Sequence, residues 1–245
     1  MKFGLTAVLL TLCFFSVRPA SAQFNTQDSI YYQAALTHTI KVYYNQLGDQ
    51  SPLYNGSKYI QYPYTFREST PYFPSDNFNM GTLVYDGMRF DSVALLYDNL
   101  RQYLVTSQNG YQLQLINERV STFSISGHQF IRVVADSSNK EITSTGFYEV
   151  LYPGRSRVLK VTNQQIQEIA SNTEGMIRYV ESGDVYYVKS GMIYIRVKSK
   201  QELIKIFSGY EKEIKQFIKK NKLNYRKNKD NTFIQAAGYY DQIAK

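Results

Sequence analysis

Residues 185–195 read VYYVKSGMIYI, and this stretch contains the pattern that decides the fold. Two short runs of Val, Ile and Tyr flank Ser190-Gly191, whose glycine accepts the positive φ of a tight turn. Similar pairs stand at Asp86-Gly87, Asn109-Gly110, Ser126-Gly127 and Ser182-Gly183. Between them, alternation such as YQLQL at 111–115 is typical of strands with one buried face. The spacing predicts roughly ten antiparallel strands over residues 80–198, as in a sandwich or a barrel.

Residues 23–79, which precede this β domain, divide into a helical part and an irregular part. Residues 26–46 carry a loose apolar stripe at helical spacing and predict an N-terminal helix. Residues 51–79 are rich in tyrosine and contain four prolines, which predicts an ordered loop or edge segment packed by its tyrosines. Within the β domain, the spacing of Ile166, Ile169 and Ala170 predicts a short helical insertion over 161–176.

Residues 199–245 change to a helical period. Ser199 and Glu202 have the spacing of a capping box, which marks a helix start. An apolar stripe follows, formed by Leu203, Phe207, Tyr210, Ile214 and Phe217. A second helix is predicted to begin near Asn228. The two stripes predict a basic helical hairpin packed on the β domain, so the whole chain is expected to be an α+β protein.

Residues 1–22 have the features of a signal peptide. Lys2 precedes an apolar run, and Ala20-Ser21-Ala22 supplies the small residues that signal peptidase requires, so Gln23 should begin the mature chain. Cys13 lies inside the apolar run after Leu12, which argues against a lipoprotein. The mature chain then has no cysteine for a disulfide, a thiolate nucleophile or a zinc site. We therefore predict an exported protein, periplasmic or outer-membrane-associated, that does not span the membrane after cleavage.

The charge is distributed unevenly along the chain. Residues 23–195 contain 13 Lys or Arg and 15 Asp or Glu, whereas residues 196–245 contain 13 and 5. Around the turn between the last two helices, the predicted docking residues for an acidic partner are Lys219, Lys220, Lys222, Arg226, Lys227 and Lys229. The expected partner is an envelope protein or an anionic lipid or lipopolysaccharide surface, because an exported protein seldom meets nucleic acid. A solvated helix face is the alternative interpretation.

The sequence contains few residues in patterns typical of catalytic or metal-binding sites. His38 and His128 are the two histidines, they lie far apart, and no metal-binding spacing includes them. The sequence has no G-x-S-x-G elbow, no G-x-G-x-x-G and no P-loop. No catalytic, cofactor-binding or metal-binding residue is therefore predicted. Four acids on neighbouring strand candidates leave a carboxylate-dependent hydrolase of envelope glycans open: Asp86, Asp91, Asp98 and Glu118.

Four runs of the chain carry a family resemblance. They are LYNGSKYIQY at 53–62, GTLVYDGMRFDSVALLYD at 81–98, LVTSQNGYQLQLINERVSTFSI at 104–125 and VKSKQELIKIFSGYEKEIKQFIKKNKLNYRKN at 197–228. Together they resemble a family of exported, β-rich proteins of Bacteroidetes-type bacteria that has no established activity. The resemblance implies a compartment and an architecture, and it implies no site residues.

These observations favour a non-enzymatic binding or accessory protein of the cell envelope. Its β domain would be the scaffold that binds a partner, and its basic helices would serve docking or stabilisation. One alternative is a β-barrel carrier of a lipid or another small apolar ligand. The glycan hydrolase is the second alternative.

Overall fold

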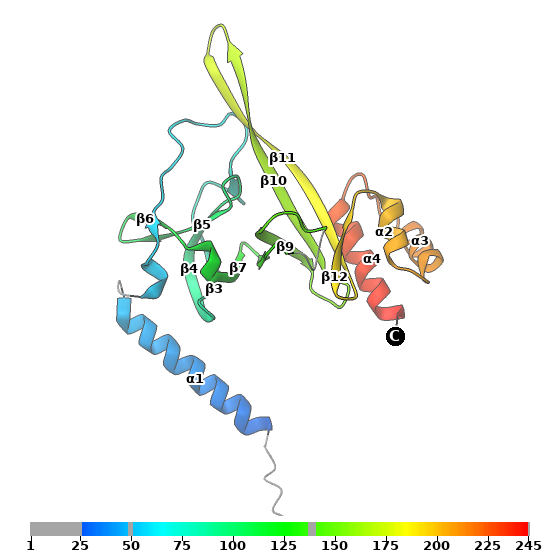
Figure 1. Cartoon of the computed structure of the whole chain (residues 1–245), viewed down its shortest axis with the longest axis horizontal. Coiled ribbons are helices and arrows are strands. Elements are labelled where there is room, and N and C mark those ends of the chain that lie inside the picture. The colour runs from blue at the N-terminus through cyan, green and yellow to red at the C-terminus, as the bar shows by residue number, and fades with distance from the viewer. Residues whose placement is uncertain (1–25, 49–50, 137–140, 245) are drawn as a thin grey trace, which may run out of the picture. The chain divides into compact units, whose positions relative to one another are not determined.

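The computed structural model describes residues 26–48, 51–136 and 141–244, and the chain divides into two units after Gln46 (Figure 1). The predicted signal peptide, residues 1–22, lies outside the described residues. In the first unit, helix α1 spans Thr26–Leu47, which confirms the helix predicted for 26–46. None of the helices in the described ranges is long and apolar enough to cross a membrane.

The second unit contains one antiparallel sheet of twelve strands. The strands are β1 (Ser57–Lys58), β2 (Tyr72–Phe73), β3 (Asn79–Tyr85), β4 (Met88–Asp98), β5 (Tyr103–Gln108), β6 (Tyr111–Gln114), β7 (Val120–Ile125), β8 (His128–Val133), β9 (Gly146–Tyr152), β10 (Val158–Ser171), β11 (Gly175–Ser190) and β12 (Ile193–Val197). Their order is β1-β6-β5-β4-β3-β7-β8-β9-β10-β11-β12, and β2 pairs with β4. The α+β prediction with mostly antiparallel strands is confirmed. Within the described residues, however, the strands form one open sheet, and the expected sandwich or barrel-like closure is not found.

Most of the hairpins form where the sequence predicts them. Asp86, Asn109 and Ser126 each have a positive φ and are each followed by a glycine with a positive φ, as a two-residue hairpin turn requires. The hairpin predicted at Ser190-Gly191 also forms, between β11 and β12, but its loop is Gly191-Met192 because Ser190 pairs with Ile193. The turn predicted at Ser182-Gly183 is wrong, because Gly183 lies inside β11 opposite Asn163.

The helical insertion predicted for residues 161–176 is also wrong. These residues complete β10, turn, and begin β11. Their pairing runs without interruption from Val158 opposite Val188 to Ser171 opposite Gly175. This continuous ladder satisfies the backbone groups and therefore overrides the helical spacing of Ile166 and Ile169.

The C-terminal region contains three helices instead of the predicted two: α2 (Lys200–Ile206), α3 (Glu211–Lys220) and α4 (Lys229–Ile243). The first predicted helix is broken before Gly209, whose φ of +83° is incompatible with a continuous α-helix. The Ser199 cap forms as predicted, and Glu202 reaches back to the residue before the cap. Ser199 Oγ accepts from the Glu202 N–H at 3.2 Å, and Glu202 Oε2 accepts from the Lys198 N–H at 2.7 Å.

The C-terminal helices pack on the sheet through a core of their own (Figure 1). Leu203, Phe207, Ile214 and Phe233 are buried there with residues of the sheet: Val158, Tyr186, Val188 and Val197. The ring of Tyr186 on β11 stacks on that of Phe233 on α4, with centroids 4.5 Å apart. A second core, centred on Tyr97, Phe123 and Phe130, lies under β3–β8. The helices are thus part of the folded unit and carry the basic residues on its surface.

Candidate anion-binding site

A pocket of about 420 Å³ lies on the surface of the C-terminal helices. Its lining residues are Lys200, Ile218, Lys219, Lys222, Leu223, Asn224, Tyr225 and Arg226. Four of them are cations, and three of these four, Lys219, Lys222 and Arg226, belong to the predicted docking set. The other three predicted residues, Lys220, Lys227 and Lys229, are exposed but do not line the pocket. The structure therefore brings half of the predicted docking set together.

The C-terminal end of α3 shapes the first part of the pocket. The Leu223 N–H donates to the Ile218 carbonyl at 3.0 Å, and the Lys222 N–H donates to the Lys219 carbonyl at 3.1 Å. Lys222 has a φ of +53°, so the chain turns back over the last turn of the helix. Lys219, Lys222 and Leu223 line the pocket here, together with the almost fully buried Ile218.

The connection between α3 and α4 shapes the second part. Asn224 Oδ1 accepts from the backbone N–H groups of Arg226 and Lys227, each at 3.1 Å. The Asn228 N–H donates to the Asn224 carbonyl at 2.9 Å, and Asn228 Oδ1 caps α4 by accepting from the Asn231 N–H at 2.9 Å. Local hydrogen bonds therefore hold the loop that carries Arg226 in a defined conformation.

Lys200 is the cation of this pocket that the sequence prediction missed. It is the first residue of α2, and the other three cations follow it by nineteen or more positions in the sequence. No local pattern joins Lys200 to them, because the contact depends on how α2 lies beside α3. Among the described residues, none of the four pocket cations takes part in an ion pair.

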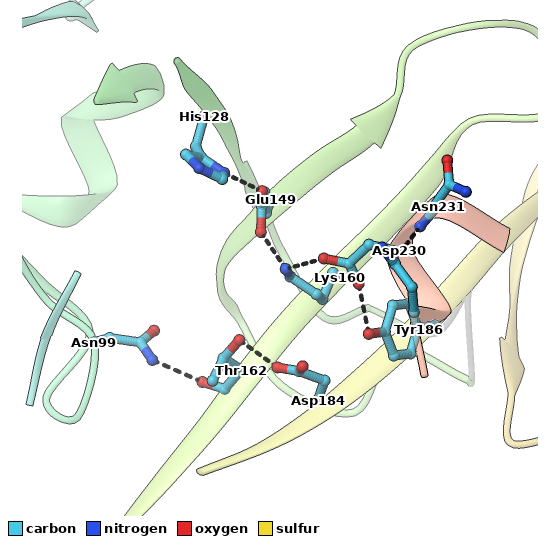
Figure 2. A network of polar contacts seen from close by, with 10 residues as sticks. Asn99, His128, Glu149, Lys160, Thr162, Asp184, Tyr186, Asp230 and Asn231 are labelled. Carbon is cyan, nitrogen blue, oxygen red and sulfur yellow. Dashed lines mark hydrogen bonds and ion pairs between the residues drawn. The ribbon is translucent and has the colours of Figure 1, made fainter. Parts of the chain in front are cut away.

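An ion network fixes the start of α4, directly after this loop (Figure 2). Lys160 Nζ on β10 lies 2.8 Å from Asp230 Oδ2 on α4 and 2.8 Å from Glu149 Oε2 on β9. The Tyr186 hydroxyl donates to Asp230 Oδ1 at 2.6 Å. Glu149 Oε1 lies 2.5 Å from His128 Nδ1. Both oxygens of the buried Glu149 are thus engaged, and α4 is tied to the sheet.

The pKa shifts in this network agree with its geometry. Burial lowers the pKa of Lys160, but the hydrogen bonds with Asp230 and Glu149 outweigh burial and raise the pKa overall. Burial raises the pKa of Tyr186, and its hydrogen bond to Asp230 raises that pKa further. Lys160 is therefore a cation and Tyr186 a neutral donor at physiological pH. In these protonation states Lys160 and Tyr186 both bind Asp230 and hold it in place.

The two histidines belong to different units of the chain. His128 is the first residue of β8, contacts Glu149, and packs edge-on against Phe73 with ring centroids 5.0 Å apart. His38 belongs to the separate unit that contains α1. Across residues 26–48, 51–136 and 141–244, no group of three or more His, Cys, Asp or Glu side chains could hold a metal ion.

The four candidate hydrolase acids each have a structural partner. Arg119 lies 3.4 Å from Asp86, Arg89 lies 2.9 Å from Asp91, and Arg132 lies 3.9 Å from Glu118. Asp98 is fully buried and accepts from the hydroxyls of Tyr59 and Tyr62 at 2.7 and 3.0 Å, and from the Arg101 N–H at 3.0 Å. These contacts give each of the four acids a role in turns and packing.

A larger hollow of about 830 Å³ lies at the β1–β6 edge of the sheet. Ile60 and Tyr111, both well exposed, line it with a single cation, Lys58. The smaller pocket on the C-terminal helices therefore differs from this hollow in its charge, because four cations line it. No protein-family model, curated protein or solved structure matches the chain.

Proposed function

We propose that this chain is a non-enzymatic protein of the cell envelope that docks on anionic lipid head groups through its basic pocket. The sheet is the scaffold, and the network around Asp230 holds the pocket in place. The observation that carries the proposal is the convergence of Lys200, Lys219, Lys222 and Arg226 on one pocket. The predicted leader at residues 1–22 supports the compartment.

The physics of the pocket favours phosphate groups carried on an amphiphile. A basic residue close to an anionic membrane contributes about 1 kcal/mol of binding free energy, so four contribute about 4 kcal/mol, roughly a thousandfold in affinity. Arg226 supplies a planar donor suited to phosphate oxygens. The half-buried Leu223 and Tyr225 add apolar surface among the cations, which suits a head group attached to acyl chains better than an acidic protein face.

Vesicle co-sedimentation tests the proposal. The protein should bind vesicles that contain phosphatidylglycerol and should not bind pure phosphatidylcholine vesicles, and added salt should weaken the binding. Replacing Lys219, Lys222 and Arg226 together with Gln should lower the affinity roughly 100-fold, because about 3 kcal/mol is removed.

The matched control replaces three lysines of α2 and α3 that do not line the pocket. Lys205, Lys212 and Lys215 are exposed, and their replacement with Gln removes the same net charge. The control should retain most of the binding. Equal losses in the two triple variants would reject the pocket as the site. Absence of binding to anionic vesicles, with binding to an acidic protein instead, would overturn the choice of a lipid partner.

A further inference from the structure

The distal half of the β10–β11 hairpin is a two-stranded ribbon (Figure 1). On one side β9 pairs only with residues 158–160, and on the other β12 pairs only with residues 186–190. Beyond these contacts, residues 161–171 and 175–185 have only each other as strand partners within the described part of the chain. An isolated two-stranded ribbon is marginally stable in water, so a further strand paired with one of its edges would stabilise it.

The contacts of β11 show which backbone groups point out of the ribbon. The Arg178 carbonyl accepts from the Arg67 N–H at 2.8 Å, and the Val180 N–H donates to Ser69 Oγ at 2.8 Å. Even-numbered residues of this part of β11 therefore bond outward, and odd-numbered ones bond to β10. The register places Val180 opposite Ile166, so even-numbered residues of β10 bond outward on the other edge.

This second edge of the ribbon is open. The Thr162 carbonyl accepts from Asn99 Nδ2 at 3.1 Å, and beyond it no strand of the described residues pairs with the outer edge of β10. The residues whose backbone groups face outward there are Gln164, Ile166, Glu168 and Ala170. Of these residues, Ile166 is 37% exposed. An open, unpaired edge of this kind is a template for another strand.

We propose that β10 pairs with β10 of a second copy of the chain, antiparallel and across a twofold axis at Ile166. An antiparallel edge is complementary to itself under such an axis. In this register Ile166 faces Ile166 of the second copy, and Gln164 faces Glu168 of the second copy. The pairing therefore places an apolar pair at the axis and no like charges opposite each other, and the charge of Glu168 is already paired with Arg178 within the ribbon.

The neighbouring registers are less favourable. An axis at Glu168 would place two carboxylates directly opposite each other, which destabilises a strand pair. An axis at Gln164 would extend the second copy toward residues 158–160, which already pair with β9. The axis at Ile166 avoids both conflicts, and the dimer interface joins two ribbons into a four-stranded sheet.

Cysteine cross-linking tests the register. Cys13 is the single cysteine, so in a Cys13→Ser background an introduced cysteine has no other thiol in the chain to pair with. Opposed Cα atoms in an antiparallel pair lie about 5.5 Å apart, which is within disulfide range. Ile166→Cys should form a disulfide-linked dimer under mild oxidation. Ser182→Cys, on the opposite edge of the ribbon, should remain monomeric on a non-reducing gel, and equal cross-linking of both would overturn the proposal.

Light scattering coupled to size-exclusion chromatography tests the dimer itself. The native chain should elute with twice its monomer mass, and Ile166→Pro should weaken the dimer at least tenfold. Proline removes an outward N–H that the ribbon does not use, and circular dichroism would verify that the fold survives. Ser182→Pro is the matched control and should remain dimeric. A native chain that is monomeric at every concentration would overturn the proposal, even if another protein were found to add a strand to this edge.

Discussion

Asp98 shows, at the scale of one residue, how the tyrosines of residues 51–79 are held. Its carboxylate is fully buried and accepts from the hydroxyls of Tyr59 and Tyr62. Burial raises the pKa of Tyr59, and the hydrogen bonds with Tyr72 and Asp98 raise it further, so the neutral donor is the stable form. The sequence predicts a turn role for Asp98 beside Asn99, and the Arg101 N–H donates to it as such a turn requires. The sequence does not predict the contacts with the tyrosines, because Tyr59 lies 39 positions away from Asp98.

Asp98→Ala should therefore lower the free energy of unfolding by about 2–4 kcal/mol, because the hydroxyls of the buried Tyr59 and the half-buried Tyr62 lose their acceptor. Urea denaturation at neutral pH measures this change. Asp91→Ala is the control, since Asp91 forms an exposed ion pair with Arg89 and its loss should change stability by no more than about 0.5 kcal/mol. Equal stabilities of the two variants would show that the hydroxyls find other acceptors.

A second residue-scale prediction concerns Lys200, which the sequence did not connect with the docking set. Lys200→Gln should weaken binding to anionic vesicles roughly fivefold, because one of four converging charges is lost. Lys205→Gln, on the same helix but outside the pocket, is the control. If the co-sedimentation isotherms of the two variants coincide, Lys200 is not part of the binding site.

At the scale of elements, the sequence predicted those features that depend on short-range chemistry. The glycine turns after Asp86, Asn109 and Ser126 and the cap at Ser199 all form, because each needs only neighbouring residues. Other features depend on partners distant in sequence and were not predicted. Residues 161–171 form a strand because β11 supplies a long ladder, and Lys200 joins the pocket because α2 meets α3.

The apolar stripe on α2 and α3 predicts that substitutions on its buried and exposed sides will differ in their effect on stability. Phe207 is 2% exposed, and its ring lies 4.6 Å from that of Tyr240, centroid to centroid. Phe207→Ala should lower the free energy of unfolding by about 3–5 kcal/mol, because it leaves a cavity. Lys212→Ala, on the exposed side of α3, should change it by no more than about 0.5 kcal/mol. Equal, negligible changes in a denaturation series would contradict the packing of these helices on the sheet.

Alkaline pH should weaken the attachment of α4 to the sheet. The pKa values of Lys160 and Tyr186 are raised in the folded state above the ordinary values of 10.5 and 10.0. Their contributions are therefore complete below about pH 10 and are lost as the pH rises toward the folded-state values. The free energy of unfolding should be level from pH 7 to 9 and then fall.

Tyr186→Phe should reduce that alkaline slope by up to about 1.4 kcal/mol per pH unit, because one titrating group is removed. Urea denaturation at several values between pH 9 and 11 would measure it. Tyr111→Phe replaces an exposed tyrosine and should retain the native slope. An unchanged slope in Tyr186→Phe would show that the network does not govern alkaline unfolding.

At the scale of the whole molecule, the C-terminal helices cannot be removed without loss of core. Deleting residues 199–245 would expose the sheet residues Val158, Tyr186 and Val188, which are buried against the helices. The truncated chain should lose its cooperative thermal transition, which calorimetry would detect. The basic helices therefore combine stabilisation with the proposed docking. A truncation that melts cooperatively near the native temperature would separate the two roles.

The order of the strands has a consequence for the kinetics of folding. From β3 to β6 and from β7 to β12, each strand pairs with the one that precedes it in the chain. The junction between β3 and β7 interrupts this order and pairs Gly81 with Ile125. Most pairings close short loops and should form rapidly, whereas this junction must close a much longer one. The β1–β6 pairing also closes a long loop, but it is only two residues long and contributes little to the sheet. The encounter of β3 with β7 is therefore the expected rate-limiting step. Conservative truncations such as Val84→Ala or Thr122→Ser at the junction should slow refolding more than equally destabilising changes in β10 or β11.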